Sequence, residues 1–185
     1  IQYDRLILAP GIDLDFDAVE GYGEMDVNQV PHAWKAGMQT AVLRQQLTTM
    51  RDGGTMVIAP PKGAQRCPTA VYERASMVAH YLKNQKPKSK ILILDGEETF
   101  ANQALFEDGW KKQFAYGTKE SIIERVSGSD GKLARIDVRS RTAYAGTNED
   151  AIAADVLNVI PPQKAGAIAF AAGVIDKSSW CPVNH

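Results

Sequence analysis

Apolar and polar positions in the middle of the chain predict a β-α-β unit. Residues 55–59 and 90–95 are short apolar runs of the kind found in buried parallel strands. Between them, apolar residues recur at helical spacing over residues 71–84. The face of this helix expected to contact the core carries Val71, Ala75, Val78 and Leu82. The pattern therefore indicates an α/β protein with a parallel sheet.

The flanking segments predict further elements of the same fold. A strand over residues 2–9 is expected to end in a tight turn at Ala9-Pro10-Gly11. An acidic, glycine-rich loop follows, and then an amphipathic helix over residues 33–50. Beyond the central unit we expect a helix at 101–112, strands at 122–126, 133–138, 142–145 and 155–160, a turn at 127–131, and an alanine-rich helix at 163–172.

The turn between the first central strand and its helix lacks the features of a nucleotide-binding turn. It reads PPKGAQRCPTAVY, whereas a dinucleotide-binding turn reads G-x-G-x-x-G, so that backbone amides can approach a pyrophosphate. Here Gly63 is the only glycine, and prolines remove amide donors. Cys67 stands just ahead of the helix, with Glu73 six residues later. The sequence thus predicts redox chemistry without NAD(P).

Composition excludes several classes of function. The chain has 185 residues with 21 basic and 22 acidic side chains, so its net charge of −1 argues against a nucleic-acid partner. No apolar stretch approaches the roughly 18 residues of a membrane helix, and no metal-ligand spacing occurs among the cysteines and histidines. Because the chain starts inside an expected strand and stops two residues after Val183, we expect it to be an internal piece of a longer protein.

Several strings of residues resemble one family. They are PHAWKAG at 31–37, RCP at 66–68, YERASMVAHYLKNQKPKSKILILD at 72–95, ADVLNVIPPQKAG at 154–166 and WCPV at 180–183. Over nearly the whole chain, the sequence resembles the flavoprotein subunit of flavocytochrome c sulfide dehydrogenase. The wider family is similar to sulfide:quinone oxidoreductases and to glutathione-reductase-like flavoproteins.

The resemblance implies a Rossmann-like, glutathione-reductase-like α/β fold with FAD/NAD(P)-binding domains. Residues 1–52 would be the C-terminal part of the first pass of an FAD domain. Residues 53–144 would form a degenerate NAD(P)-binding-like Rossmann domain, and residues 145–185 the return to the FAD domain.

The resemblance also implies a function. The intact enzyme would be periplasmic and would oxidise sulfide through a redox-active disulfide beside FAD, passing electrons to a c-type cytochrome subunit that carries the haem. Cys67 matches the flavin-side cysteine, whose partner lies outside this chain, and Glu73 matches a candidate base. Pro10 and Gly11 are expected to contact the cofactor. The family tends to read CPPGPYER, whereas this turn reads CPTAVYER.

Simpler interpretations stay open for each of these residues. Cys67 could be a buried structural thiol, and Glu73 an acid that complements the helix dipole. His32 and Trp34 suit packing at a helix start, Asp95 suits a turn, and Cys181 suits an inert thiol. The whole chain could also be a non-catalytic docking or structural module, or belong to a pyridine nucleotide-disulfide oxidoreductase, although the missing glycine turn argues against the last.

Overall fold

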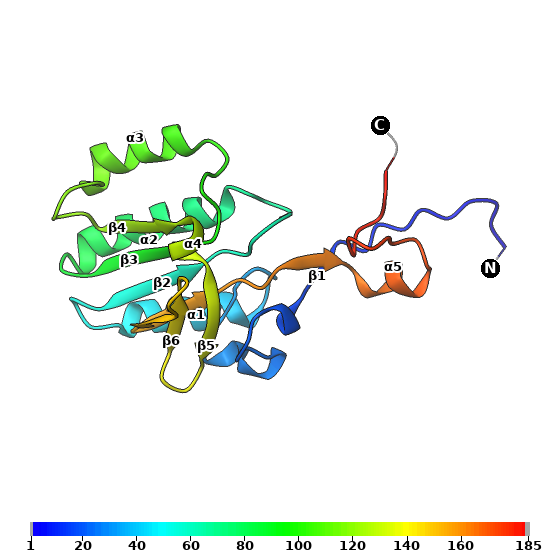
Figure 1. Cartoon of the computed structure of the whole chain (residues 1–185), viewed down its shortest axis with the longest axis horizontal. Coiled ribbons are helices and arrows are strands. Elements are labelled where there is room, and N and C mark those ends of the chain that lie inside the picture. The colour runs from blue at the N-terminus through cyan, green and yellow to red at the C-terminus, as the bar shows by residue number, and fades with distance from the viewer. Residues whose placement is uncertain (1, 184–185) are drawn as a thin grey trace.

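The computed structural model describes residues 2–183 and has a parallel sheet at its centre (Figure 1). Its strand order is β4-β3-β2-β8. These strands are Ile123–Ser127, Lys90–Asp95, Thr55–Ala59 and Val156–Val159. All three pairings are parallel, with Val57 of β2 opposite Leu92 on one side and Leu157 on the other. The predicted α/β, Rossmann-like fold is confirmed.

Helices cover one face of this sheet and a second sheet covers the other. Helices α1 (Met38–Thr49), α2 (Ala70–Gln85) and α3 (Gln103–Phe114) lie with Met56 and Ile58 in one core cluster. On the opposite face, Val57 and Ala59 pack under an antiparallel sheet of β5, β6 and β7. These strands are Leu133–Asp137, Thr142–Ala145 and Asp150–Ala153. Alternate residues of β2 thus serve two cores, as the period of a strand requires.

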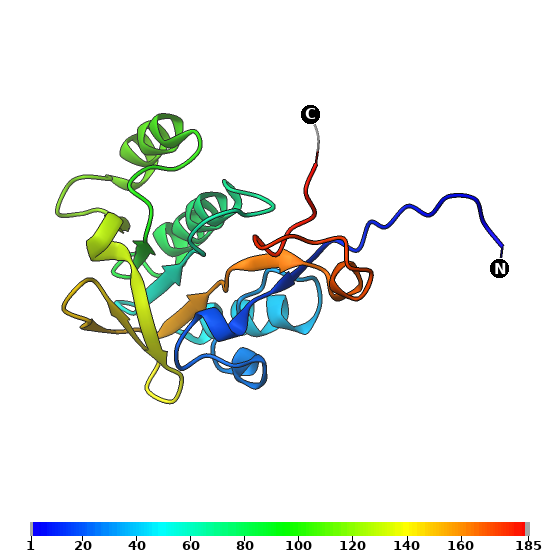
Figure 2. The ribbon, with the colours of Figure 1, turned by 45° about the vertical axis from the view of Figure 1, so that its right-hand side comes forward.

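A two-stranded ribbon runs away from the central sheet (Figure 2). It consists of β1 (Ile12–Leu14) and β9 (Gln163–Ala165), which pair antiparallel with Ile12 opposite Ala165. The remaining elements are the 3₁₀ turns η1 (Phe16–Ala18) and η2 (Glu24–Asn28) and the short helices α4 (Gly128–Gly131) and α5 (Ala167–Ala171). No helix within residues 2–183 is long and apolar enough to cross a membrane.

The central elements match the sequence predictions closely. The strands at 55–59 and 90–95 are β2 and β3, and the helix predicted at 71–84 is α2. All four of its predicted core residues are buried. The helix predicted at 101–112 and the strands at 122–126, 133–138, 142–145 and 155–160 also form, with ends shifted by a few residues. The division into domains at 52 and 144 stays a prediction.

The predicted opening strand is wrong. Residues 2–9 are irregular and exposed, and the first strand of the described chain is β1 at Ile12. Ile7 is 90% exposed, so the apolar run buries nothing. A strand needs a neighbour for its backbone N–H and C=O groups, and β9 provides one only from Ile12 onward. An apolar run without a neighbouring strand is therefore not enough to predict a strand.

The two outer helices also differ from prediction. Residues 163–165 of the expected alanine-rich helix form β9, because β1 supplies a strand partner, and the helix begins only after Gly166. The helix expected at 33–50 begins at Met38, since Ala33 and Gly37 have positive φ angles. The turn at 127–131 closes as the single helical turn α4, and β7 was not foreseen because its sequence, DAIA, lacks an apolar run.

Candidate functional site

A cavity of about 530 Å³ opens where three segments meet. These are the turn between β2 and α2, the start of the β1–β9 ribbon, and the loop ahead of α1. Its lining residues are Pro10, Gly11, Ile12, Ala33, Trp34, Lys35, Ala36, Arg66, Cys67, Ala70 and Arg74. The cavity lies beyond the carboxyl end of β2, which is where ligands bind in open parallel α/β sheets.

Cys67 lies in the long turn that joins β2 to α2. Gln163 of β9 holds this turn, since its Oε1 accepts a hydrogen bond from the Arg66 backbone N–H at 2.8 Å. The Cys67 carbonyl accepts from the N–H of Ala70, the first residue of α2, at 3.3 Å. The thiol is free and exposed, as is that of Cys181. Cys67 is therefore an accessible thiol on a cavity wall, and the buried-thiol alternative does not hold.

Pro10 and Gly11 line the same cavity as Cys67. Gly166 makes their position possible: a Cβ at this glycine would lie 2.9 Å from Pro10 Cβ, so a side chain there would force the two segments apart. The Gly166 N–H donates to the Gly11 carbonyl at 3.2 Å. Gly11 itself has φ +74°, which suits glycine. The structure thus brings together three of the four predicted site residues.

Glu73 is the fourth predicted site residue, and it does not line the cavity. Its side chain is exposed, and Oε1 accepts a hydrogen bond from Thr69 Oγ1 at 2.7 Å. This position in the first turn of α2 suits an acid that complements the helix dipole. Its role as a base stays a prediction.

Arg74 is a residue of this site that sequence reasoning missed. Its guanidinium donates to the carbonyls of His32 at 2.9 Å and Ala33 at 2.6 Å, and to Asn158 Oδ1 at 2.8 Å. It also lies 5.1 Å from the ring of Trp34. Burial lowers the pKa of Arg74 to about 10. No carboxylate of residues 2–183 forms an ion pair with it.

Two signals in the sequence could have revealed this arginine. Arg74 lies three residues after Val71 and four before Val78, on the buried face of α2. Asn158 interrupts the apolar run of β8 and is fully buried. A half-buried cation and a buried amide at such positions need polar partners, and here each partly satisfies the other.

His32 is buried and packs beside the cavity. Its Nδ1 accepts from the Trp34 backbone N–H at 2.9 Å, and its Nε2 lies 2.9 Å from the Gln39 side-chain nitrogen. Burial, and then the charges of Lys35 and Arg74, lower the pKa of His32 to about 4. The imidazole is therefore neutral at pH 7 and serves packing, as the simpler interpretation held.

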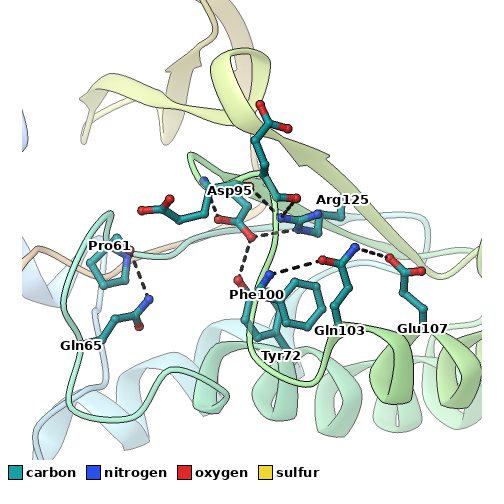
Figure 3. A network of polar contacts seen from close by, with 10 residues as sticks. Pro61, Gln65, Tyr72, Asp95, Phe100, Gln103, Glu107 and Arg125 are labelled. Carbon is teal, nitrogen blue, oxygen red and sulfur yellow. Dashed lines mark hydrogen bonds and ion pairs between the residues drawn. The ribbon is translucent and has the colours of Figure 1, made fainter.

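A second polar cluster lies at the carboxyl end of β3 (Figure 3). Asp95 Oδ2 accepts hydrogen bonds from Tyr72 Oη at 2.7 Å and from Arg125 Nε at 2.9 Å, while Oδ1 accepts the Glu97 N–H at 3.0 Å. Both charged side chains are almost completely buried. Burial, followed by the bond to Asp95, raises the pKa of Tyr72.

Aromatic rings close this cluster on one side. Phe100 stacks on Tyr72 with ring centroids 3.6 Å apart, and the Arg125 guanidinium lies 5.0 Å from the Phe100 centroid. Arg125 also donates to the carbonyls of Glu97 and Glu98. Asp95 therefore does more than shape a turn: it is the anionic partner of a buried arginine, a role that the sequence did not predict.

Together these features define a class: a Rossmann-like α/β protein with a free thiol in place of the phosphate-binding turn. Comparison with known families agrees with this class. The family described as sulfide dehydrogenase (flavocytochrome c) flavoprotein chain, central, matches residues 40–161, about two thirds of the chain. The chain belongs to this family. The match includes Cys67, Glu73 and Arg74, while Pro10 and Gly11 lie outside it.

Proposed function

We propose that this chain takes part in the FAD-dependent oxidation of sulfide and that its electrons pass to a c-type cytochrome. The family name, a flavoprotein chain of flavocytochrome c sulfide dehydrogenase, supports both the cofactor and the cytochrome partner. The observation that carries the proposal is the position of Cys67. Its thiol lies on a large open cavity together with Pro10 and Gly11, the residues expected to contact the flavin.

The cavity suits the redox-active ring of a flavin. Trp34 gives it an aromatic wall, and Gly11, where even a Cβ would meet nothing within 4 Å, leaves one side open. Arg74 offers a positive charge at the wall. When bound, FAD would supply an acceptor for an electron pair and a donor of single electrons to the cytochrome haem.

Cys67 would act as one half of a redox-active disulfide. Attack of hydrosulfide on that bond forms a new S–S bond, giving a persulfide on one sulfur, and breaks the old bond, releasing the other sulfur as a thiolate. The open position of Cys67 gives a small anion access to its sulfur. Sulfide as the substrate and the periplasm as the compartment follow from the family resemblance and belong to the proposal.

NAD(P)H is not the proposed electron donor. The turn from β2 offers Pro60, Pro61 and Pro68 where a pyrophosphate would need amides. At the end of β3, the acid that could bind a ribose is already engaged by Tyr72 and Arg125. Both observations oppose the alternative of a pyridine nucleotide-disulfide oxidoreductase.

The test uses the assembled flavoprotein–cytochrome complex with Cys67→Ser and, as a matched control, Cys181→Ser. Sulfide-dependent cytochrome c reduction should be abolished in the first variant, because a hydroxyl cannot form the disulfide or persulfide, while flavin content stays near that of the wild type. Cys181→Ser should keep most of its activity. Near-normal turnover of Cys67→Ser would overturn the proposal and favour a non-catalytic module.

A further inference from the structure

We propose that the cavity beside Cys67 is an anion-binding site and that Arg74 is its fixed charge. The ligand class is a small, singly charged sulfur anion, held next to the Cys67 sulfur. The identity of the ligand as a sulfur anion rests on the proposed function. The preference of the cavity for anions over neutral ligands does not depend on that function.

The charges around the cavity have one sign. Lys35, Arg66 and Arg74 line it, and no aspartate or glutamate is among its lining residues in the described chain. Lys35 is already paired, since its Nζ lies 2.7 Å from Asp13 Oδ1. Arg66 and Arg74 have no carboxylate partner among residues 2–183. Two positive charges are therefore left for a ligand.

Arg74 is the more constrained of these two cations. All three of its hydrogen-bond acceptors are neutral: the carbonyls of His32 and Ala33 and the side-chain oxygen of Asn158. Asn158 is itself fixed, because its Nδ2 donates to the carbonyls of Pro31 at 2.6 Å and His32 at 3.1 Å. The guanidinium is thus held in place before any ligand arrives, and its orientation costs nothing on binding.

Burial without a counter-charge gives this cation a reason to bind an anion. Removing a guanidinium from water is unfavourable unless opposite charge is nearby. Within residues 2–183 the fold gives Arg74 only neutral acceptors, and the His32 side chain, whose backbone carbonyl is one of these contacts, is neutral at pH 7. An anion in the cavity would offset the desolvation of Arg74, whereas a neutral ligand of the same size would not.

Alkylation of the two cysteines in the assembled complex, after reduction of any disulfide at Cys67, tests the charge selectivity directly. Iodoacetate is anionic and iodoacetamide is neutral, and both react with the same thiolate, so the ratio of their rate constants cancels intrinsic thiol reactivity. Cys181 is exposed and serves as a reference within the same chain. We expect the iodoacetate/iodoacetamide ratio, measured by peptide mass spectrometry, to be about fivefold higher at Cys67, the effect of one unit charge at contact distance in water.

Two variants assign the effect to Arg74. Arg74→Gln keeps hydrogen-bonding capacity without charge and should lower the ratio at Cys67 to the smaller excess over Cys181 that Arg66 contributes. Arg74→Lys keeps the charge and should retain most of the difference. Arg44→Met, an exposed arginine on α1, is the matched control and should change nothing. An unchanged ratio in a folded Arg74→Gln protein would overturn the role of Arg74.

A measurement on the unchanged protein covers the case in which Arg74→Gln does not fold. Raising the ionic strength from 0.01 to about 0.5 M should remove most of the difference between the cysteines, because salt screens charge at an open site. Equal ratios at low salt would overturn the anion site. Anion preference at Cys67 together with full activity of Cys67→Ser would instead keep this site and reject the proposed function.

Discussion

Arg125 and Arg74, two arginines near the carboxyl edge of one sheet, have opposite surroundings. Arg125 on β4 pairs with Asp95, and its side chain is 5% exposed. Its remaining donors reach carbonyls, and Phe100 covers its face. Arg74 on α2 has three neutral acceptors and a cavity beside it. The two side chains have the same charge, but only Arg125 has that charge neutralised within the fold.

This difference indicates that the carboxyl end of β3 has a structural role, whereas the carboxyl end of β2 is the candidate functional site. In a dinucleotide-binding protein, both ends would contact the ligand. Here the end of β3 is filled by the chain's own side chains, and Asp95, the acid that could bind a ribose, is engaged by Tyr72 and Arg125. The end of β2 has exchanged its phosphate-binding turn for Cys67 and an open cavity. The charge of Arg74, which has no carboxylate partner among residues 2–183, lies at the end for which we propose a ligand.

Asp95→Asn should have the largest effect on stability. The change keeps the shape of the side chain but leaves Arg125 buried beside a neutral partner, which we expect to lower the free energy of unfolding by about 3–5 kcal/mol. Urea denaturation followed by circular dichroism measures it.

Asp108→Asn is the matched control for this change. Asp108 forms an exposed pair with Lys112 on α3, and such pairs contribute at most about 0.5 kcal/mol. Equal losses in the two variants would show that the Asp95–Arg125 pair does not hold this end of the sheet together.

Lowering the pH should destabilise the folded protein through protonation of His32, which lies beside the cavity. The pKa of His32 is about 4 in the folded state against 6.5 as its ordinary value, so the unfolded state binds more protons between these pH values and stability falls as pH drops through that window. When the pH is lowered from 7 to 4.5, the free energy of unfolding should fall by about 2–3 kcal/mol more in the wild type than in His32→Gln.

The measurement is the urea midpoint and slope at both pH values. His80→Gln, at an exposed position on α2, should keep the wild-type loss. If His32→Gln retains the full acid sensitivity, protonation of His32 does not cause it.

Tyr72→Phe measures how much the hydrogen bond to Asp95 stabilises the polar cluster at the end of β3. It removes the hydroxyl that donates to Asp95 but leaves the ring stacked on Phe100. Because the acceptor is charged, we expect a loss of about 1.5–2 kcal/mol. Tyr81→Phe on the same helix has no such bond and should cost less than about 0.5 kcal/mol, as measured by urea denaturation. Losses of the same size would mean that the Asp95 bond contributes no net stability.

The sequence allowed prediction of the elements that depend on local pattern. Buried parallel strands are continuous apolar runs, so β2 and β3 were found with their bounds, and the period of α2 identified its core face. The strand predicted at residues 2–9 failed, since pairing depends on a partner that lies about 150 residues away, as β1 and β9 show.

The candidate site was predictable only in part, for the same reason. Cys67 was found because it replaces a local motif, the glycine turn. Arg74 was missed because its partners, His32, Ala33 and Asn158, are distant in sequence and two of them contribute only carbonyls. Whether a charge is neutralised depends on tertiary contacts, and no spacing of residues along α2 reports it.

Glu73→Gln should have the smallest effect on stability of the changes considered. It also decides whether Glu73 only stabilises the start of α2 or acts as a base in sulfide oxidation. The side chain is exposed and bonded to Thr69 in the first turn of α2, so its loss should lower the free energy of unfolding by less than about 0.5 kcal/mol.

In the assembled complex, a base that deprotonates sulfide species would be needed most at low pH, where fewer of them are already ionised. A role as base therefore predicts that the variant slows sulfide-dependent cytochrome reduction most at low pH, whereas a role confined to the start of α2, outside the cavity lining, predicts the wild-type pH profile. Thr69→Ala, which removes only the bonding partner, is its control. A loss of turnover that grows as the pH falls, in Glu73→Gln and not in Thr69→Ala, would instead make Glu73 the base and extend the reacting site beyond the cavity.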